Sequence, residues 1–324
     1  MTYQEIRLEF EHYIEKEIFD TSSYPLYYAI NYIMASGAKR FRPTLLMMSY
    51  HIFRDDIKRT LPAAFAIELF HNFTLIHDDI MDNAFIRRGK PAVHEKFGLN
   101  QAILSGDAMM MIAYQYLMRS SSKENIASVM ETMTKMAIEV CEGQDLDMVF
   151  EKKNVVEVSE YLKMIELKTS VLLAASLKIG GLLAGAKDTD VHHLYEFGRN
   201  IGIAFQIQDD ILDTFGNSQN VGKRIGGDIY QKKKTYLFTK ALEILSPEIR
   251  NHLLSYYTSD KELIENDVSE VKSIFKNNLV LEEARIEQER YYGIAMDHLS
   301  AIEASEDRKS PLKKVSRMLF ERKF

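Results

Sequence analysis

Two short acidic sequences in apolar surroundings constrain this chain more than any other feature. The first runs from His71 to Asp82 and reads HNFTLIHDDIMD; it lacks Gly and Pro, which favours a helix. Because a helix turns by about 100° per residue, Asp78 and Asp82 lie on one face, one turn apart. His71, seven residues before Asp78, falls on nearly the same face. Carboxylates at this spacing repel each other unless a cation or water separates them.

A near-copy of this sequence occurs later, between Phe205 and Asp213. Asp209 and Asp213 repeat the spacing of four residues, and Gln206 lies three residues before Asp209. Both copies have apolar neighbours, among which a carboxylate without a partner is costly. One such sequence is as compatible with a solvated helix end as with a cation site, but two copies favour the cation site. Carboxylate oxygens suit Mg²⁺, which keeps several waters and usually bridges carboxylates to phosphates. We therefore predict a diphosphate held through magnesium between two helices.

The composition excludes several classes of protein. With 324 residues, of which 46% are hydrophobic and 27% charged, the chain is too apolar for disorder. Its net charge of −6 gives no support to nucleic-acid binding. No linker rich in Pro, Gly or Ser divides the chain, so a single domain over residues 1–324 is expected. The single cysteine, Cys141, excludes an internal disulfide and fits a cytoplasmic protein.

No segment predicts a stable insertion into a membrane. The first residues, Met1 to Glu5, lack the basic and apolar pattern of a signal peptide. The most apolar stretch, Val171 to Gly185, is interrupted by Lys178 and is shorter than the ~20 residues that a membrane span needs.

Helical periodicity dominates the chain, and no convincing run of alternating β-branched residues occurs. Helices are expected over residues 3–20, 25–34, 44–53, 61–82, 100–118, 126–150, 158–184 and 188–215. Gly216 to Asp228 contains four Gly and is followed by the lysine-containing segment Gln231 to Tyr236. The rest of the chain, to Phe324, has the pattern of amphipathic helix with a break near Ser305–Pro311. These elements predict an all-α, antiparallel helical bundle with a central active-site cavity, because ligand sites in bundles form between facing helices.

Cationic side chains lie near the acidic sequences. Lys39 and Arg42 are three residues apart, so one helical turn would present both to one ligand. Arg87 and Arg88 belong to a basic loop that follows the first acidic sequence. Basic loops are usually only solvated, but arginine binds phosphate in a bidentate way, and this placement favours the phosphate-binding role. Lys168 lies within an apolar helix, where a lysine either reaches water or turns inward.

Together these residues resemble the trans-isoprenyl diphosphate synthases, also called polyprenyl synthetases. Order and spacing match over roughly residues 25 to 240. The matching segments are Gly37–Pro43, His71, Asp78–Asp82, Arg87–Gly89, Gly143-Gln144, Lys168-Thr169, Phe205–Asp213, Gly222-Lys223 and Lys233. One departure is Ala38, where many members have a second Gly; it affects only the local loop shape. The resemblance implies a helical bundle of the isoprenoid synthase type and a homodimer.

The resemblance also implies which residues bind metal and substrates. Magnesium ions, about three per site and some bound only with substrate, would bridge both acidic sequences to an allylic diphosphate. The expected metal ligands are Asp78, Asp82 and Asp209, supported by Asp79, Asp210 and Asp213. The allylic diphosphate would be held by Arg87, Lys168, Thr169, Gln206, Lys223 and Lys233. Isopentenyl diphosphate would bind without metal at Lys39, Arg42, His71 and Arg88. Gln144 and Asp147 match a motif that supports the region of Lys168.

The implied reaction is the head-to-tail condensation of isopentenyl diphosphate with dimethylallyl, geranyl or farnesyl diphosphate. The residues expected to act in catalysis are Asp78, Asp79, Asp82, Arg87, Lys168, Asp209 and Lys223. The family sets product length with residues five and four positions before the first Asp, here Phe73 and Thr74. A Phe there stops the growing chain at moderate length, so a geranylgeranyl or farnesyl product is expected.

Three other functions are compatible with parts of the pattern. A class I terpene cyclase shares the all-α fold and the first acidic sequence, but its second metal motif normally contains Asn or Asp, Ser or Thr, and Glu. A regulatory subunit of a two-chain synthase usually lacks one acidic sequence, whereas both occur here. A long-chain synthase is disfavoured by Phe73.

Overall fold

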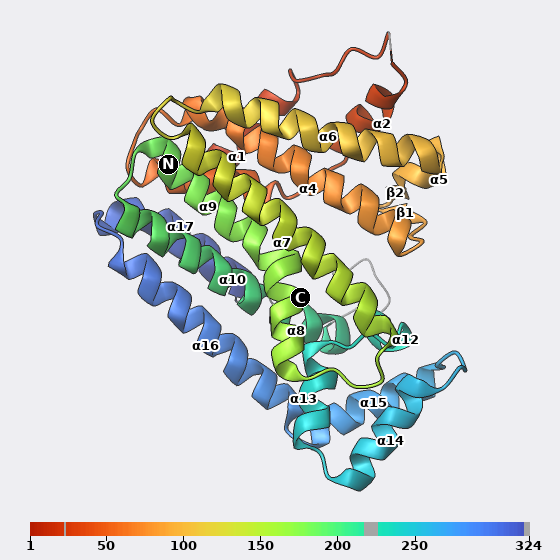
Figure 1. Cartoon of the computed structure of the whole chain (residues 1–324). Coiled ribbons are helices and arrows are strands. Elements are labelled where there is room, and N and C mark those ends of the chain that lie inside the picture. The colour runs from red at the N-terminus through yellow and green to blue at the C-terminus, as the bar shows by residue number, and fades with distance from the viewer. Residues whose placement is uncertain (23, 217–225, 321–324) are drawn as a thin grey trace. The chain divides into compact units, whose positions relative to one another are not determined.

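The computed structural model describes residues 1–22, 24–216 and 226–320, which are mostly helical (Figure 1). In chain order the elements are α1 (Tyr3–Ile14), α2 (Leu26–Met34), α3 (Phe41–His51), the 3₁₀ helix η1 (Ile57–Thr60), α4 (Leu61–Met81), β1 (Ile86–Arg87), β2 (Lys90–Pro91), α5 (Val93–Phe97), α6 (Leu99–Ser120), α7 (Ile126–Lys152), α8 (Val158–Ile165), the π-helical turn η2 (Glu166–Ser170), α9 (Val171–Ala184), α10 (Asp188–Phe215), α12 (Gly227–Tyr230), α13 (Tyr236–Ile244), α14 (Pro247–Thr258), α15 (Glu265–Asn277), α16 (Val280–Ala301) and α17 (Glu306–Phe320). The predicted all-α class is confirmed.

The sequence predicts the long helices in the middle of the chain well. The larger errors lie in the first helix and in the break before the last one. The first helix ends at Ile14, six residues before the predicted boundary at residue 20. The C-terminal break also lies earlier than expected, because α17 begins at Glu306 and contains Pro311. Pro311 is the sixth residue of α17, beyond the first four residues whose N–H groups lack partners within the helix, so it removes one hydrogen bond from the helix interior without ending the helix.

The chain forms two compact units that interleave along the sequence. The first unit comprises Met1–Thr134, Ala175–Leu194 and Glu303–Leu312, and the second comprises Lys135–Ala174, Tyr195–Ile302 and Lys313–Phe324. Each unit therefore draws on separate stretches of chain, and no linker in the sequence marks a boundary between them. The single domain expected from composition remains a prediction.

In the first unit, α4 and α6 lie side by side over much of their lengths (Figure 1). α4 carries apolar residues on nearly all sides, among them Phe65, Leu69 and Phe70, which have no exposed surface. A helix that is apolar all round is buried by its neighbours. α1, α2 and α3 also pack against this unit's helices, so α4 is enclosed along its length and its C-terminal end can be held in place.

A short hairpin follows α4 in the region where the sequence predicted a basic loop. β1 and β2 are antiparallel, with Arg87 opposite Lys90. The two turn residues, Arg88 (φ 53°) and Gly89 (φ 73°), both have positive φ. This is the pattern of a type I′ turn, which suits the twist of a hairpin. The turn fixes the direction in which Arg87 and Arg88 leave the backbone.

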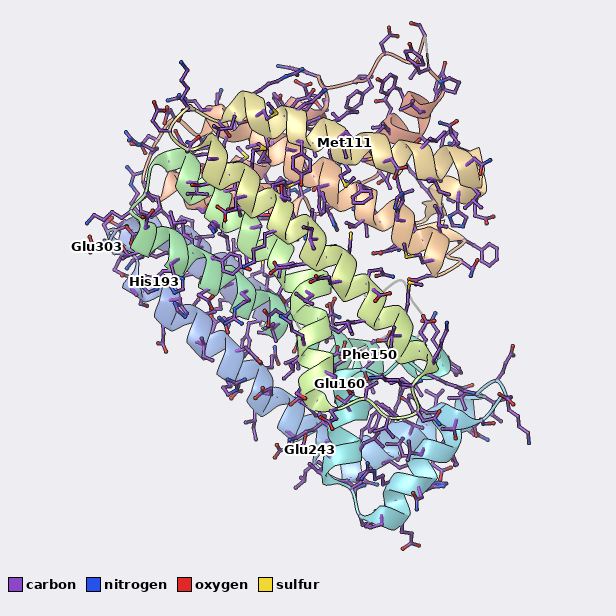
Figure 2. All side chains as sticks on the ribbon, in the orientation of Figure 1. Met111, Phe150, Glu160, His193, Glu243 and Glu303 are labelled. Atoms are coloured by element: carbon purple, nitrogen blue, oxygen red, sulfur yellow. The ribbon has the colours of Figure 1, made fainter. Side chains whose placement is uncertain are left out.

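The second unit has its own apolar core. It is built from α8, the later part of α10, and α13 to α16, and α13 packs against both α8 and α16. Phe150 on α7 belongs to this core and is 3% exposed (Figure 2). Phe238 and Tyr257 stack in it with ring centroids 4.0 Å apart. This core surrounds the end of α10 that carries the second acidic sequence.

The long helix that the sequence predicted over residues 158–184 has these bounds in the structure, where α8, the π-helical turn η2 and α9 follow one another directly. The sequence analysis considered only Val171–Gly185 and judged it too short to cross a membrane, but the whole of Val158–Ala184, with a mean hydropathy of 1.4 in its most apolar window, is long and apolar enough by length and composition alone. However, 72% of that window is buried inside the protein. A core helix has the same length and composition, and this degree of burial is typical of one.

A buried ion pair joins α3 to α4 in the first unit. Arg40 precedes α3 with a positive φ of 48°, and its side chain is 7% exposed. Its Nη1 donates to Glu68 Oε1 (2.5 Å), and its Nη2 donates to the carbonyl of Met34. Asn72 Nδ2 donates to the same Glu68 oxygen (3.1 Å). The sequence analysis assigned no role to these side chains, although Glu68 is the only charged residue between Leu61 and Phe70.

Replacing Glu68 with Ala should destabilise the protein strongly, because the guanidinium of Arg40 would remain buried without its carboxylate. We expect a loss of about 3–5 kcal/mol in the free energy of unfolding, measured by urea denaturation. Glu9→Ala is the matched control, because Glu9 pairs with Lys58 on the surface (3.3 Å). It should cost no more than about 0.5 kcal/mol. Equal losses for the two variants would contradict the buried role of Glu68.

Candidate functional site

The first acidic sequence forms the C-terminal end of α4. Asp78 is partly buried, and Asp82, directly after the last helical residue, is exposed. The Asp82 N–H donates to the Asp78 carbonyl (2.8 Å), which closes the last turn. The carbonyl groups at a helix C-terminus carry partial negative charge, which adds to that of the carboxylates. This end of α4 therefore attracts a cation more strongly than the side chains alone would.

The second acidic sequence occupies the last turns of α10, so both acidic sequences lie at helix C-termini. Asp209 and Asp213 are partly buried, in contrast to the buried Asp210 between them. Asp213 Oδ2 accepts a hydrogen bond from the N–H of Asp228 (2.9 Å). That bond ties the end of α10 to α12, beyond residues 217–225.

The central carboxylate of the first sequence, Asp79, faces the protein interior. It has no exposed surface, and its Oδ1 accepts hydrogen bonds from Nε (2.8 Å) and Nη2 of Arg87. Burial lowers the pKa of Arg87, but the hydrogen bond and charge of Asp79, with the charges of Asp78 and Asp82, outweigh it and raise that pKa. Arg87 is therefore always charged, and its bond to Asp79 holds it close to the carboxylates of Asp78 and Asp82.

The central carboxylate of the second sequence, Asp210, is buried in the same way. Its Oδ2 accepts hydrogen bonds from the Tyr161 hydroxyl (2.5 Å) and from the N–H of Tyr236 (2.8 Å). Gln206 Nε2 donates to its Oδ1 (3.4 Å). Burial raises the pKa of Asp210 to about 8, and the charge of Asp228 acts in the same direction, while these hydrogen bonds oppose it.

A cationic cluster surrounds His71 in the first unit. Arg42 Nη1 lies 3.2 Å from His71 Nε2. Arg88 Nη1 donates to Ser36 Oγ (3.0 Å) and to Asn72 Oδ1 (3.3 Å). Burial lowers the pKa of His71 well below its usual value, and the neighbouring arginines lower it further. The imidazole is therefore neutral, so this cluster presents guanidinium charge together with a neutral ring that can donate or accept a hydrogen bond.

Lys39 lies beside this cluster in sequence but on the surface. Its side chain is exposed in the segment before α3, and its carbonyl accepts a hydrogen bond from the Tyr3 hydroxyl (2.9 Å). Phe73 is buried and contacts the rings of Phe70 and His77 edge to face. The Thr74 hydroxyl donates to the carbonyl of His71 (2.8 Å).

Lys168 and Thr169 lie in the π-helical turn η2, which interrupts the helix between α8 and α9. Such turns are rare and frequently occur at functional sites. Lys168 Nζ donates to Asp147 Oδ2 of α7 (2.6 Å). α7 approaches closely here because Gly143 has no side chain: a Cβ on it would lie 2.3 Å from the backbone nitrogen of Lys168. The sequence analysis listed Gly143 only as part of the resemblance and gave it no structural role, whereas it expected Asp147 to support the region of Lys168.

The second unit also contains two glutamines that the sequence analysis named, Gln206 and Gln144. The hydroxyl of Thr169 donates to Gln206 Oε1 (3.5 Å), and Gln206 in turn donates to Asp210. Gln144 is buried, and among the residues that the structure describes neither its Nε2 nor its Oε1 has a hydrogen-bond partner. A buried amide without partners is costly, so Gln144 is a polar group that the described part of the protein does not satisfy. Lys233 is exposed, while Lys223 lies outside the described residues.

The donor groups fit magnesium that is shared with a phosphate. Within residues 1–22, 24–216 and 226–320, no three His, Cys, Asp or Glu side chains converge to hold a metal ion by themselves. Each acidic sequence offers an outer pair of carboxylates instead, Asp78 with Asp82 and Asp209 with Asp213. Mg²⁺ is commonly bound by one or two carboxylates together with substrate phosphates and water.

The structure thus brings several predicted residues together within each unit. The first unit joins Arg42, His71 and Arg88, and separately Asp79 and Arg87. The second joins Thr169, Gln206 and Asp210. The two acidic sequences belong to different units, so their convergence on one diphosphate remains a prediction. The sequence analysis gave no role to Glu68 and Arg40, and it also gave none to Asn72 and Tyr161. Asn72 accepts a hydrogen bond from Arg88, and Tyr161 donates one to Asp210.

Comparisons with known proteins show which family the chain belongs to. The chain matches the polyprenyl synthetase family over residues 24–277. It is 39% identical over 276 residues to a short chain isoprenyl diphosphate synthase of Methanocaldococcus jannaschii, covering 85% of this chain and 82% of that protein. It is 40% identical over 285 residues to a geranylgeranyl diphosphate synthase of Sulfolobus acidocaldarius, covering 87% and 86%.

A similar fold occurs in a solved structure, the geranylgeranyl pyrophosphate synthetase from Pyrococcus horikoshii. The TM-score is 0.91 at 34% identity, and the match covers 99% of this chain and 98% of that one. The family match spans well over half of the chain, and the relatives align over most of their own lengths. The chain is therefore a member of the polyprenyl synthetase family.

Proposed function

We propose that this protein is a short-chain trans-prenyltransferase that condenses isopentenyl diphosphate with an allylic diphosphate. The observation that carries the proposal is the pairing of two kinds of anion site in the first unit. Arg42, His71 and Arg88 form a cationic cluster suited to a diphosphate without metal. Asp78 and Asp82 form an acidic pair suited to a diphosphate that arrives with metal ions. An enzyme that joins two diphosphates, only one of which ionises, needs both kinds of site.

The chemistry requires the allylic C–O bond to break, which leaves negative charge on the departing diphosphate. Magnesium bound to the outer carboxylates Asp78, Asp82 and Asp209 would neutralise part of that charge. Arg87, Lys168 and Lys223 add donors whose charge does not depend on metal. Holding isopentenyl diphosphate on its own cationic cluster keeps the two partners together, which lowers the entropic part of the barrier.

The new C–C bond forms when the double bond of isopentenyl diphosphate attacks the allylic cation. A proton is then lost from the carbon next to the new cationic centre. The released diphosphate is the base that we assign, because no side chain among the candidate residues is an evident base. His71 is neutral but lies within the cationic cluster, where taking up a proton is strongly disfavoured.

A product of geranylgeranyl or farnesyl length is consistent with the position of Phe73. Five residues of helix separate it from Asp78, which corresponds to roughly 7.5 Å. Its ring is held between Phe70 and His77, with centroids 5.3 and 4.8 Å away. A ring held on two sides moves less easily out of the path of a growing chain. The relatives named above include geranylgeranyl synthases.

We further propose that the protein acts as a homodimer through α6. Leu104, Met111 and Met118 recur every seven residues on this helix, and more than half of each side chain is exposed. Figure 2 marks Met111 on the middle of α6. Apolar residues at a seven-residue spacing suit the pairing of two helices, so a second copy of the same surface is the partner that fits.

The condensation itself is tested with the purified chain, radiolabelled isopentenyl diphosphate and dimethylallyl, geranyl or farnesyl diphosphate, with products identified by mass spectrometry. We expect geranylgeranyl or farnesyl diphosphate in the presence of Mg²⁺ and no product with excess EDTA, because the outer carboxylates hold the allylic diphosphate only through metal. A hydrocarbon released from geranylgeranyl diphosphate alone would indicate a terpene cyclase. An inactive but folded chain would indicate a subunit of a two-chain synthase.

Phe73→Ala should lengthen the product, because it removes the ring that we assign to the end of the chain's path. Product length is compared with the wild type by thin-layer chromatography. Phe10→Ala is the control, since Phe10 is an equally enclosed ring in α1 of the same unit. That variant should lose stability, by about 3–5 kcal/mol, without any change in product length. An unchanged product from Phe73→Ala counts against the assignment.

Met111→Glu should convert the dimer to monomer, because it places a charge at the centre of the apolar stripe on α6. The molar mass is measured by size-exclusion chromatography with light scattering. Ile286→Glu on α16 is the control, because Ile286 is similarly exposed and lies outside the stripe. A dimer that survives Met111→Glu but not Ile286→Glu would place the interface elsewhere.

A further inference from the structure

The two acidic sequences share a feature that their spacing does not reveal: in each, the central aspartate differs from the outer pair. Asp79 is 0% and Asp210 is 3% exposed, whereas Asp82 is exposed and Asp209 and Asp213 are partly buried. Helix geometry explains the difference. The outer residues of each sequence lie within about 40° of each other around the helix, while the central residue lies about 100° from the first of them. The central side chains therefore point into the protein.

In the first unit, Asp79 holds the hairpin that follows α4. Its Oδ1 accepts from both Nε and Nη2 of Arg87, and its backbone carbonyl accepts from the N–H of Ala84 (2.9 Å). The side chain and the backbone of one residue thus tie down the chain from Ala84 to Arg87. Arg88, at the turn of the same hairpin, reaches Asn72 in the cationic cluster. The position of both arginines consequently depends on Asp79.

In the second unit, Asp210 holds the start of α13. Tyr236 is the first residue of that helix, and its N–H is one of the donors that have no partner within the helix. Asp210 Oδ2 accepts this N–H (2.8 Å), so the side chain of Asp210 supplies the partner that the first donor of α13 lacks within the helix. The residue lies three positions after Lys233, whose own N–H donates to the carbonyl of Asp228 (2.9 Å). The lysine segment 232–234 is thereby held by one hydrogen bond at its middle residue and by another two residues after its end.

We propose that Asp79 and Asp210 are positioning residues, each of which anchors the basic segment that follows its acidic sequence, while the outer aspartates bind the metal. This inference rests on the proposed function, because it assigns Arg87 and Lys233 to the diphosphate. It also gives the third aspartate of each sequence a role, because a buried carboxyl group with a fixed donor partner is less accessible to an exchangeable ion than the outer carboxylates are.

The second oxygen of Asp79 makes the inference testable. Within residues 1–22, 24–216 and 226–320, Asp79 Oδ2 is buried and has no hydrogen-bond partner. If that oxygen were a metal ligand, the loss of its charge would raise the magnesium requirement as much as the loss of an outer aspartate. Isosteric substitutions separate the two roles, since Asp→Asn keeps the shape of the side chain but removes its capacity to bind a metal ion as a carboxylate.

The experiment measures the binding of inorganic pyrophosphate to the intact protein by titration calorimetry at increasing Mg²⁺ concentrations. Asp82→Asn and Asp209→Asn should raise the Mg²⁺ concentration for half-maximal binding by tenfold or more. Asp79→Asn and Asp210→Asn should leave it within twofold of the wild type. A tenfold increase for either central variant would overturn the inference for that residue.

A second measurement distinguishes positioning from a merely structural role. At saturating Mg²⁺, Asp79→Asn should weaken pyrophosphate binding by at least threefold in the chain with Arg87, and by less than twofold in an Arg87→Ala background. Asp82→Asn should weaken it by the same factor in both backgrounds. Equal effects of Asp79→Asn in the two backgrounds would show that Asp79 does not act through Arg87.

The outcome is separable from that of the proposed function. A wild-type protein that neither binds pyrophosphate with magnesium nor forms a prenyl product would refute the function itself. A wild-type protein that does both, with Asp79 and Asp210 variants that behave like the outer ones, would refute only the positioning role.

Discussion

The cost of holding like charges together inside an apolar protein governs much of this structure. Both acidic sequences lie at helix C-termini, where the backbone adds further negative charge. Such an arrangement is stable only with compensating cations. Asp79 obtains one from Arg87 within the protein, and Asp210 is compensated by donors while its pKa rises to about 8. The outer carboxylates retain a negative field, which is the property that a metal–diphosphate site requires.

The cationic cluster raises the same problem with the opposite sign. Arg40, Arg42 and Arg88 approach one another around His71, and their mutual repulsion would oppose folding. One buried acid, Glu68, offsets part of this repulsion. It forms an ion pair with Arg40 and accepts a hydrogen bond from Asn72. Neutral His71 adds no further charge. The three arginines outnumber this one acid, so the cluster carries net positive charge and favours an anion.

Much of the fold was predictable from hydrophobic periodicity, because long helices leave a strong signal. Details that depend on contacts between distant segments were not. The π-helical turn at Lys168 has no local signature, and it coincides with a close approach of α7 that only the absence of a side chain at Gly143 permits. The hairpin after α4 depends on a positive φ at Arg88, and an arginine in the sequence does not indicate that backbone conformation. Glu68 was recognisable as a lone acid in an apolar helix, but its partner Arg40 was not.

What the sequence determined by itself is the chemistry: two acidic pairs at a helical spacing, basic residues near them, and an all-α chain that resembles polyprenyl synthetases. Residue type and spacing along one helix suffice for this, because a helix converts sequence separation directly into position on its surface. The tertiary structure decided how each charge is used. Asp78 and Asp79 are neighbours of the same type, yet one lies near the surface and the other is enclosed against Arg87. That difference arises from the packing around α4, which no local pattern contains.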